Sequence, residues 1–151
     1  MRIAIPLLAL ALFVSLVMSE VATLGSARAQ GTPSFPTGVI WQLERLPEME
    51  EYGLAAEHTF TTPSNQYAIE FLSDGTASIA ADCNRLIGRW SRTGLTGIDI
   101  AISLSALSGC PSGSYEEYFL IALDEATEFE LADSRLTLKL SDDREASFVE
   151  D

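Results

Sequence analysis

The sequence predicts a mainly β fold (α+β): an antiparallel meander curled into a small barrel-like sheet, with one α-helix near Tyr115–Ala126. Three observations lead to this prediction. Short segments with alternating apolar and polar residues recur about every 8–12 residues, as in sandwiches and barrels. Asp-Gly and Thr-Gly pairs, which are typical of turns, separate several of these segments. A single segment carries apolar residues at the three-to-four spacing of a helix.

The expected strands alternate apolar and polar residues, as in a sheet with one face in water. In the first of them, Trp41 and Leu43 are predicted to face inward. The turn Ser73-Asp74-Gly75 joins two others, because Asp-Gly accepts the positive φ values of a tight hairpin. In chain order the expected strands are Val39–Leu46, the short His58–Thr62, Tyr67–Leu72, Thr76–Ala81, Arg85–Ser91, Ile98–Ser103, Glu128–Leu131, Arg135–Leu140 and Ala146–Val149.

The predicted helix begins at a capping box, Ser114-x-x-Glu117, in which each side chain would bond a free backbone N–H of the other residue. Glu116 and Glu117 lie in the first turn, where the helix dipole favours negative charge. Pro111 and Gly113 prevent an earlier start. The apolar stripe that follows is interpreted as core packing, with a ligand site as the alternative; it comprises Tyr115, Tyr118, Phe119, Ala122, Leu123 and Ala126.

Two segments are expected to lie outside the core. Residues 30–38 hold two prolines and two glycines and are predicted to be a flexible lead-in to a single domain at residues 39–151. Residues 47–57 hold four glutamates and are interpreted as an exposed loop. This loop lacks the Asp-x-Asp-x-Asp-Gly pattern of a tightly turned calcium loop, so we predict no calcium site there.

Residues 1–29 are predicted to be a secretory signal peptide. Arg2 supplies a positive charge, residues 3–18 are uncharged and mostly apolar, and Ala27-Arg28-Ala29 is a small-x-small cleavage site before Gln30. A retained membrane anchor is the alternative, but the apolar run is short of the roughly 20 residues of a spanning helix. The leader is not followed by a cysteine that could carry a lipid. We therefore expect export to the periplasm or the extracellular space, with no stable membrane anchor after cleavage.

The chain is acidic. Its formal net charge is −13, and loss of the leader, which contains two arginines and one glutamate, would make it −14. Nucleic acid and anionic lipid are polyanions, so this charge argues against both as partners. We interpret the charge as a solubility feature, with attraction to a cationic partner as the alternative. We expect a monomer, and the sequence names no protein partner.

Cys83 and Cys110 are the only two cysteines. In an oxidising compartment an isolated pair in a small domain usually forms a disulfide. Closing this loop would stabilise the fold by about 3–4 kcal/mol in the chain-entropy description. A metal site or a catalytic thiol is the alternative, but structural zinc needs four nitrogen or sulfur ligands and His58 is the only histidine. We predict no metal and no cofactor.

Several short motifs follow one another in a fixed order. They are Trp41-Gln42-Leu43 in the first strand, Phe71-Leu72-Ser73-Asp74-Gly75 in a hairpin, Cys83-Asn84-Arg85 followed by Gly88-Arg89-Trp90, Cys110 before a helix with Glu116 or Glu117 and Phe119-Leu120-Ile121-Ala122-Leu123, and Leu136-Thr137-Leu138 near the end. In this order and spacing, residues 39–149 resemble the META domain family, which includes HslJ-like envelope and secreted proteins. The resemblance implies a mixed barrel-like fold, an envelope or secreted role, and no established catalytic activity.

The family-motif residues Asn84, Arg85, Gly88 and Trp90 also have a structural interpretation. Asn84 suits a bend, because its side chain can bond nearby backbone. Gly88 would allow a bulge or the close approach of another segment. Trp90 is large enough to need a mostly buried position. We hypothesise that Arg85 bridges one of the two glutamates of the first helical turn; a binding site at this motif is the alternative.

No set of residues in the sequence forms a recognisable catalytic site. The sequence has no Gly-x-Ser-x-Gly elbow and no phosphate-binding glycine loop. Carboxylate pairs such as Asp142/Asp143 are neighbours in sequence, whereas glycosidase carboxylates face each other across a substrate. We therefore expect an exported non-catalytic protein, not an enzyme, with an envelope-stress or protein-interaction role. The alternatives are a binding module for a small apolar ligand, in the barrel or a surface groove, and an acidic inhibitor of a basic secreted enzyme.

Overall fold

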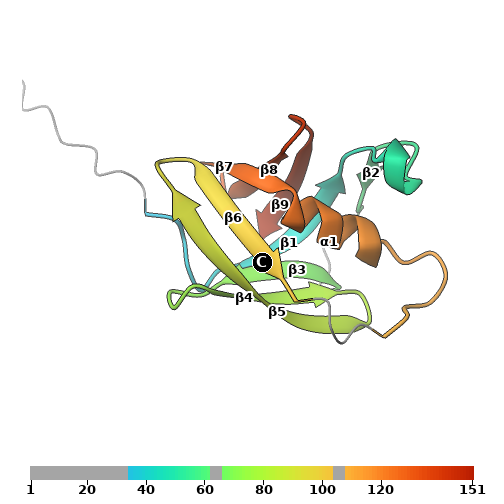
Figure 1. Cartoon of the computed structure of the whole chain (residues 1–151), viewed down its shortest axis with the longest axis horizontal. Coiled ribbons are helices and arrows are strands. Elements are labelled where there is room, and N and C mark those ends of the chain that lie inside the picture. Colours follow the sequence, from blue (N-terminus) through green and yellow to red (C-terminus); the bar gives the residue numbers. More distant parts are fainter. Residues whose placement is uncertain (1–33, 62–65, 104–107) are drawn as a thin grey trace, which may run out of the picture. The chain divides into compact units, whose positions relative to one another are not determined.

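Residues 34–61, 66–103 and 108–151 are described by a computed structural model of the chain (Figure 1). They belong to one compact unit, Thr32–Asp151. The leader predicted at residues 1–29 lies outside the described residues, as do residues 62–65 and 104–107. Across the described part of the chain, no helix has the length and apolar character needed to cross a membrane.

The described residues form a mostly β structure with one α-helix, as predicted. The elements in chain order are β1 (Ile40–Leu46), the 3-10 helix η1 (Glu50–Tyr52), β2 (His58–Thr59), β3 (Tyr67–Phe71), β4 (Thr76–Ala81), β5 (Asn84–Thr93), β6 (Gly97–Ile102), α1 (Glu116–Asp124), β7 (Ala126–Ala132), β8 (Arg135–Leu140) and β9 (Glu145–Glu150). The expected strands all appear at or within a few residues of their predicted bounds, because apolar–polar alternation marks a strand with one buried face.

The sheet closes on itself. From β3 to β9 each strand pairs antiparallel with the next in sequence, and β1 joins the two ends because it pairs with β3 on one side and with β9 on the other. At the closing seam, Trp41 pairs with Glu150 and Leu43 with Phe148. The short β2 pairs with the far end of β1, beyond the part that β3 occupies. The described strands therefore form a closed eight-stranded antiparallel barrel with β2 attached to its edge.

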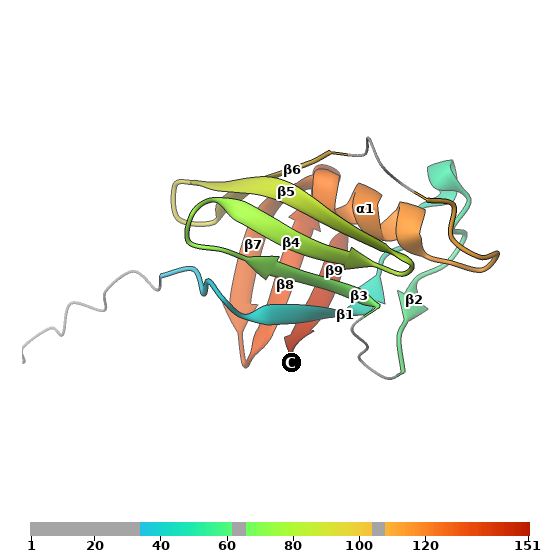
Figure 2. The same cartoon turned by 90° about the horizontal axis from the view of Figure 1, so that it is seen from below.

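The barrel is weakest between β6 and β7. These strands share a single registered pair, Gly97 with Glu128, and a hydrogen bond of 2.8 Å from the Phe129 N–H to the Thr96 carbonyl. Beyond this point α1 lies beside β6, as both views show (Figures 1 and 2). The helix therefore covers the side of β6 along which no described strand continues the sheet.

The barrel interior is filled by the protein's own side chains. Most apolar residues of the strands face inward, with Ile40 and Ile87 as exposed exceptions. The helix α1 adds Phe119, Ala122 and Leu123, none of them measurably exposed. The largest side chains with less than 2% of their surface exposed are Phe71, Phe119, Phe148, Leu43, Leu46, Met49, Ile69, Ile79, Leu123, Leu136, Leu138 and Leu140. This agrees with the tendency of small barrels to be filled by side chains.

The lead-in at residues 30–38 does contribute to the core, contrary to the prediction. Phe35 is only 6% exposed, and its ring centroid lies 4.9 Å from that of Phe71, 4.9 Å from that of Trp90 and 4.7 Å from that of Phe129. The surrounding Pro and Gly residues indicated a linker. A single aromatic residue gives no periodic pattern, so its burial could not be found from the sequence.

The acidic segment at residues 47–57 is also more ordered than expected. Met49 is fully buried and pairs with Leu54 in an isolated β-bridge that encloses η1. The glutamates of this segment do lie near the surface, and two of them form ion pairs: Glu51 with Arg144 at 2.7 Å and Glu57 with Arg45 at 3.0 Å. The interpretation as an exposed loop is therefore right for the glutamate side chains and wrong for Met49, which is buried.

The helix start differs from the predicted capping box. Tyr115 is the N-cap residue and makes no side-chain capping bond. The Ser114 hydroxyl accepts from the Glu116 N–H at 3.1 Å, and the exposed Glu117 takes no part. The Tyr115 N–H instead donates to the Tyr67 hydroxyl of β3 at 2.9 Å. A side chain from another part of the barrel therefore satisfies the N–H that begins the helix.

Phe35→Ala tests whether the lead-in is part of the core. We expect a loss of about 3 kcal/mol in the free energy of unfolding, because a buried aromatic ring is replaced by a cavity among three other rings. Urea denaturation, monitored by tryptophan fluorescence, measures this free energy of unfolding. As a control, Ile87→Ala removes a side chain that is 63% exposed and should cost less than about 0.5 kcal/mol. Equal small losses from the two variants would show that Phe35 does not contribute to the core.

Candidate functional site

The predicted cysteine pair lies at the junction of the sheet and the helix. Cys83, in the turn between β4 and β5, and Cys110, in the segment before α1, form a disulfide with Cα atoms 5.6 Å apart. The Cys83 N–H lies 3.3 Å from the Cys110 Sγ. The link ties the β4–β5 hairpin to the chain just ahead of the helix, as the sequence predicted.

Asn84, beside this disulfide, is buried at 7% exposure and uses both ends of its amide. Its Oδ1 accepts from the Ser108 N–H at 3.0 Å, and its Nδ2 donates to the Ser108 carbonyl at 2.8 Å and to the Glu116 carboxylate. One side chain therefore joins β5, the segment before the helix, and the first helical turn. We call Tyr67, Asn84 and the Cys83–Cys110 disulfide the helix anchor.

Tyr67 completes the helix anchor from β3. Its hydroxyl accepts from the Tyr115 N–H and lies 3.4 Å from the Ser114 hydroxyl. Burial raises the pKa of the Tyr67 phenol, while its hydrogen bonds with Ser114 and the Tyr115 N–H act in the opposite direction. The phenol therefore stays neutral across the ordinary pH range and serves as a structural hydrogen-bonding group.

The hypothesis that Arg85 bridges a glutamate of the helix is wrong. The Arg85 Nη1 donates to the carbonyls of Asp82 and Asn84, both at 2.9 Å, and no ion pair between described residues includes it. The neighbouring Asn84 contacts Glu116 instead. Adjacent residues of a strand point to opposite faces, so when Asn84 faces the helix, Arg85 faces away from it.

The other two motif residues have packing roles. A Cβ added to Gly88 would lie 3.0 Å from the Ala101 carbonyl oxygen of β6, so glycine permits this close strand approach, as predicted. Trp90 is half-buried, and its Nε1 donates to the Leu72 carbonyl at 2.9 Å. All the motif residues therefore make contacts that hold the fold together.

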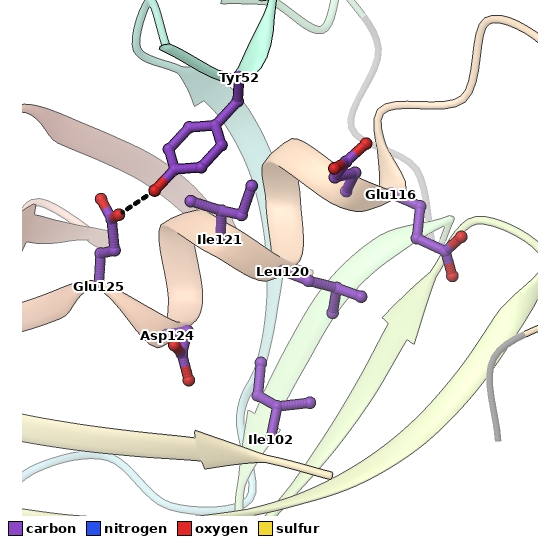
Figure 3. A pocket seen from close by; sticks show the side chains of 8 residues that line it. Tyr52, Ile102, Glu116, Leu120, Ile121, Asp124 and Glu125 are labelled. Carbon is purple, nitrogen blue, oxygen red and sulfur yellow. Dashed lines mark hydrogen bonds between the residues drawn. The ribbon is translucent and has the colours of Figure 1, made fainter. Parts of the chain in front are cut away.

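The outer side of α1 forms a groove of about 430 Å³. We call it the helix groove; it is lined by Tyr52, Ile102, Glu116, Glu117, Leu120, Ile121, Asp124 and Glu125. Figure 3 shows Tyr52 and Ile121 on one side of the helix and Leu120, Asp124 and Ile102 on the other. The groove is therefore apolar in its middle, where Leu120, Ile121 and Ile102 lie, and acidic at both ends of the helix.

Two of the four carboxylates are held in place. Asn84 bonds Glu116 at the first turn, and the Tyr52 hydroxyl donates to Glu125 at 2.9 Å after the last turn (Figure 3). The bond to Glu125 and the charge of Glu125 raise the pKa of the Tyr52 phenol. Arg144 lies 3.4 Å from the Glu125 carboxylate and is shared with Glu51 and Asp142.

The other two carboxylates, those of Glu117 and Asp124, are exposed and make no hydrogen bond or ion pair with any described residue. The last turn of α1 contains no basic residue, although the helix dipole favours cations there. The placement of Asp124 therefore does not stabilise the helix. The sequence interpretation assigned Glu116 and Glu117 to capping and missed the groove. A repeat of acid, aliphatic and acid at positions i, i+4 and i+8 could have indicated it.

Neither His58 nor the Cys83–Cys110 disulfide lines the helix groove, where the four carboxylates lie. Within residues 34–61, 66–103 and 108–151, no group of three or more His, Cys, Asp or Glu side chains is arranged to hold a metal ion. His58 stacks on Tyr115 with ring centroids 4.0 Å apart and meets the edge of Phe60 at 4.7 Å. Its contacts are those of a packing residue. The helix groove is thus the arrangement best suited to binding another molecule.

Asn84→Ala and Arg85→Ala form a matched pair that tests the helix anchor. Asn84→Ala should lower the free energy of unfolding by about 2–4 kcal/mol, because it removes a buried side chain together with its hydrogen bonds to Ser108 and Glu116. Arg85→Ala should cost less than about 1 kcal/mol, because Arg85 is exposed and donates only to nearby carbonyls. Chemical denaturation of the oxidised protein measures both. The reverse order would contradict the assignment of Asn84 as the anchor residue.

Comparison with protein families and solved structures adds to this description. A family model described as "META domain" matches residues 37–151. A DUF4847 family protein from Bacteroides vulgatus ATCC 8482 superposes with a TM-score of 0.52 at 16% identity, covering 73% of this chain and 90% of that chain. A protein from Burkholderia xenovorans, solved by NMR, superposes with a TM-score of 0.55 at 16% identity, covering 76% of this chain and 83% of that chain. No curated protein matches the sequence. At such identities the likeness to solved structures concerns the fold alone.

Proposed function

The chain belongs to the META domain family, and we propose that it is an exported, non-catalytic protein that acts by binding a partner on its outer surface. One observation carries this proposal. The barrel interior is occupied by the chain's own side chains, whereas the helix groove on the outside combines an apolar middle with carboxylates at both ends. The packed interior leaves the outer surface as the place to bind another molecule. An open groove of mixed character is the kind of surface that recognises another molecule.

Export is proposed from the sequence of residues 1–29 and is supported by the disulfide. Disulfides persist in oxidising compartments and are rare in reducing ones. The Cys83–Cys110 bond secures the segment just before α1, so an oxidised pair contributes directly to the helix anchor. A role in the envelope or outside the cell would keep this bond intact.

The absence of catalysis is proposed because the side chains that could do chemistry have structural partners. His58 stacks on Tyr115 and meets the edge of Phe60, and the two cysteines are joined to each other. Asn84 and Glu116 bond one another. These roles favour a binding protein.

A response to envelope stress is the process we propose, following the resemblance to HslJ-like proteins. The level of the transcript that encodes this protein, measured after heat or envelope damage, would show whether the protein is induced by stress. Induction together with impaired growth of a deletion strain under the same stress would support this role. A strain indifferent to both stresses would count against it.

Two alternative functions remain from the sequence. A small apolar ligand inside the barrel finds little support, because Phe71, Phe119 and Phe148 fill the interior. Inhibition of a basic secreted enzyme is favoured by the acidic groove and by the net charge of −13. Binding to basic enzymes such as lysozymes that disappears at high salt would support the inhibitor.

Expression of the full chain with a carboxy-terminal tag tests export. We expect the exported fraction to contain a protein that begins at Gln30 and has no free thiols, as shown by intact-mass measurement without reduction. A version that begins at Gln30 and lacks the leader is the control, and it should stay in the cytoplasm with reduced cysteines. Retention of the leader in the membrane fraction would instead support the anchor, and a full-length cytoplasmic protein would refute export.

Affinity capture from the native compartment tests the binding role. The oxidised protein is immobilised, exposed to the exported fraction of the source cells, and washed at low and at high salt. We expect a specific protein partner whose binding is weakened by Asp124→Asn, because Asp124 is exposed in the groove and pairs with no described residue. Failure to retain any protein above the level of a carboxylate-coated resin would contradict the proposed function.

A further inference from the structure

We propose that the helix groove binds a basic peptide segment in which one aliphatic side chain lies between two lysine or arginine residues. The proposal deepens the binding role proposed above and rests on it. The peptide is expected to lie extended along the outside of α1, with its two cations at the two acidic ends of the groove and its aliphatic side chain against the apolar middle.

The argument begins with the spacing of residues on α1. Residues four apart lie above one another on a helix, so the lining residues fall into two parallel rows. Each row reads acid, aliphatic, acid: Glu116, Leu120 and Asp124 form one row, and Glu117, Ile121 and Glu125 form the other. The ends of a row are eight residues apart, which corresponds to about 12 Å along the helix axis. The groove therefore presents two acidic ends about 12 Å apart with an apolar centre.

The walls of the groove strengthen this pattern. Ile102, at the end of β6, lies on the Leu120 side, and Tyr52, from η1, lies on the Ile121 side (Figure 3). Tyr52 is 42% exposed, so its ring is available for contact. The groove volume of about 430 Å³ lies within the range of about 300–1,000 Å³ that is typical of ligand sites.

Each row has one fixed and one free carboxylate. In the first row Glu116 is held by Asn84, and Asp124 has no partner among the described residues. In the second row Glu125 is held by Tyr52 and Arg144, and no described residue pairs with Glu117. Fixed groups reduce the entropy lost on binding. The other two carboxylates are exposed to an incoming cation, and none of the described cations forms an ion pair with them.

The charge of the groove selects a cationic occupant. Four carboxylates line it, and the only described cation within 4 Å of any of them is Arg144, at 3.4 Å from Glu125. The like charges repel one another, and an incoming pair of cations relieves that repulsion. A purely apolar ligand would leave the acidic ends unmatched.

The length of the groove fits an extended peptide. A strand rises about 3.3 Å per residue, so residues i and i+4 lie about 13 Å apart. Side chains at i, i+2 and i+4 point to the same side of an extended chain. The sequence Lys-Ser-Leu-Ser-Lys therefore directs Lys, Leu and Lys toward α1 at nearly the spacing of one acid–aliphatic–acid row.

Fluorescence anisotropy with a labelled, acetylated and amidated Lys-Ser-Leu-Ser-Lys peptide tests the proposal on the oxidised protein purified from the exported fraction. We expect saturable binding at low salt that weakens as salt rises, because exposed charges are screened. We expect Lys-Leu-Ser-Ser-Lys, which turns its leucine to the other side, and Lys-Ser-Ser-Ser-Lys to bind at least about threefold more weakly. Equal binding of all three peptides would overturn the proposal, because the apolar centre would then have no role.

Paired variants separate the groove from the overall charge. The double variant Glu117→Gln/Asp124→Asn should weaken binding by about tenfold. The control Glu128→Gln/Glu130→Gln removes the same charge from two exposed residues of β7 that do not line the groove, and should change binding less than about twofold. All four side chains are exposed and pair with no residue in the described part of the chain, so both variants should keep the wild-type circular dichroism and melting temperature. Equal weakening by the two variants would overturn the proposal in favour of non-specific attraction.

Two further outcomes decide what occupies the groove. Amide shift changes on peptide addition should concentrate at Ile102 and Glu116–Glu125 in a nitrogen-15 spectrum; changes elsewhere alone would overturn the site. Spermidine binding as tightly as the peptide would also overturn it, because the occupant would then be a small polycation. If the labelled peptide does not bind while affinity capture still yields a protein partner, only the assignment of the peptide to the groove is wrong. If capture yields nothing, the proposed function itself fails.

Discussion

The helix depends on a few polar contacts around Asn84. This buried side chain bonds the segment before α1 through Ser108 and the first helical turn through Glu116, next to the Cys83–Cys110 disulfide. The α1 helix has only nine residues, too few to be stable alone in water. It persists because its start is fixed to β3 and β5 and its apolar side closes the barrel interior.

The position of α1 explains why a groove exists at all. The strands β6 and β7 pair at a single registered position and then diverge, and the helix lies beside β6 where the sheet does not continue. A helix is wider than a strand, so its outer side and the end of β6 do not form a flat surface. Among the family-motif residues, Asn84 bonds Glu116 and so helps to hold the helix in the place where its acidic and aliphatic rows become a binding surface. Gly88 and Trp90 instead pack against other parts of the sheet.

Prediction succeeded where the physics is local. Alternation places Leu136, Leu138 and Leu140 in one buried strand face, and the structure confirms it. It failed where a side chain is buried by segments distant in sequence. Phe35 and Met49 lie in stretches with no periodic pattern, and only the closed barrel provides rings and strands to cover them.

The sequence by itself determined the strands, the presence of one helix, and the pairing of the two cysteines, because each follows from residue spacing or from there being a single possible partner. The tertiary structure decided which polar groups meet. Ser114 and Glu117 fit a capping box on paper, yet Ser114 bonds the Glu116 N–H without help from Glu117, and Tyr67 bonds the N–H of the N-cap residue Tyr115. Asn84 rather than Arg85 reaches Glu116. Such choices depend on where closure of the barrel brings β3 and β5, and no local pattern carries that information. The helix groove has the same origin, since Tyr52 and Ile102 meet α1 only in the closed barrel.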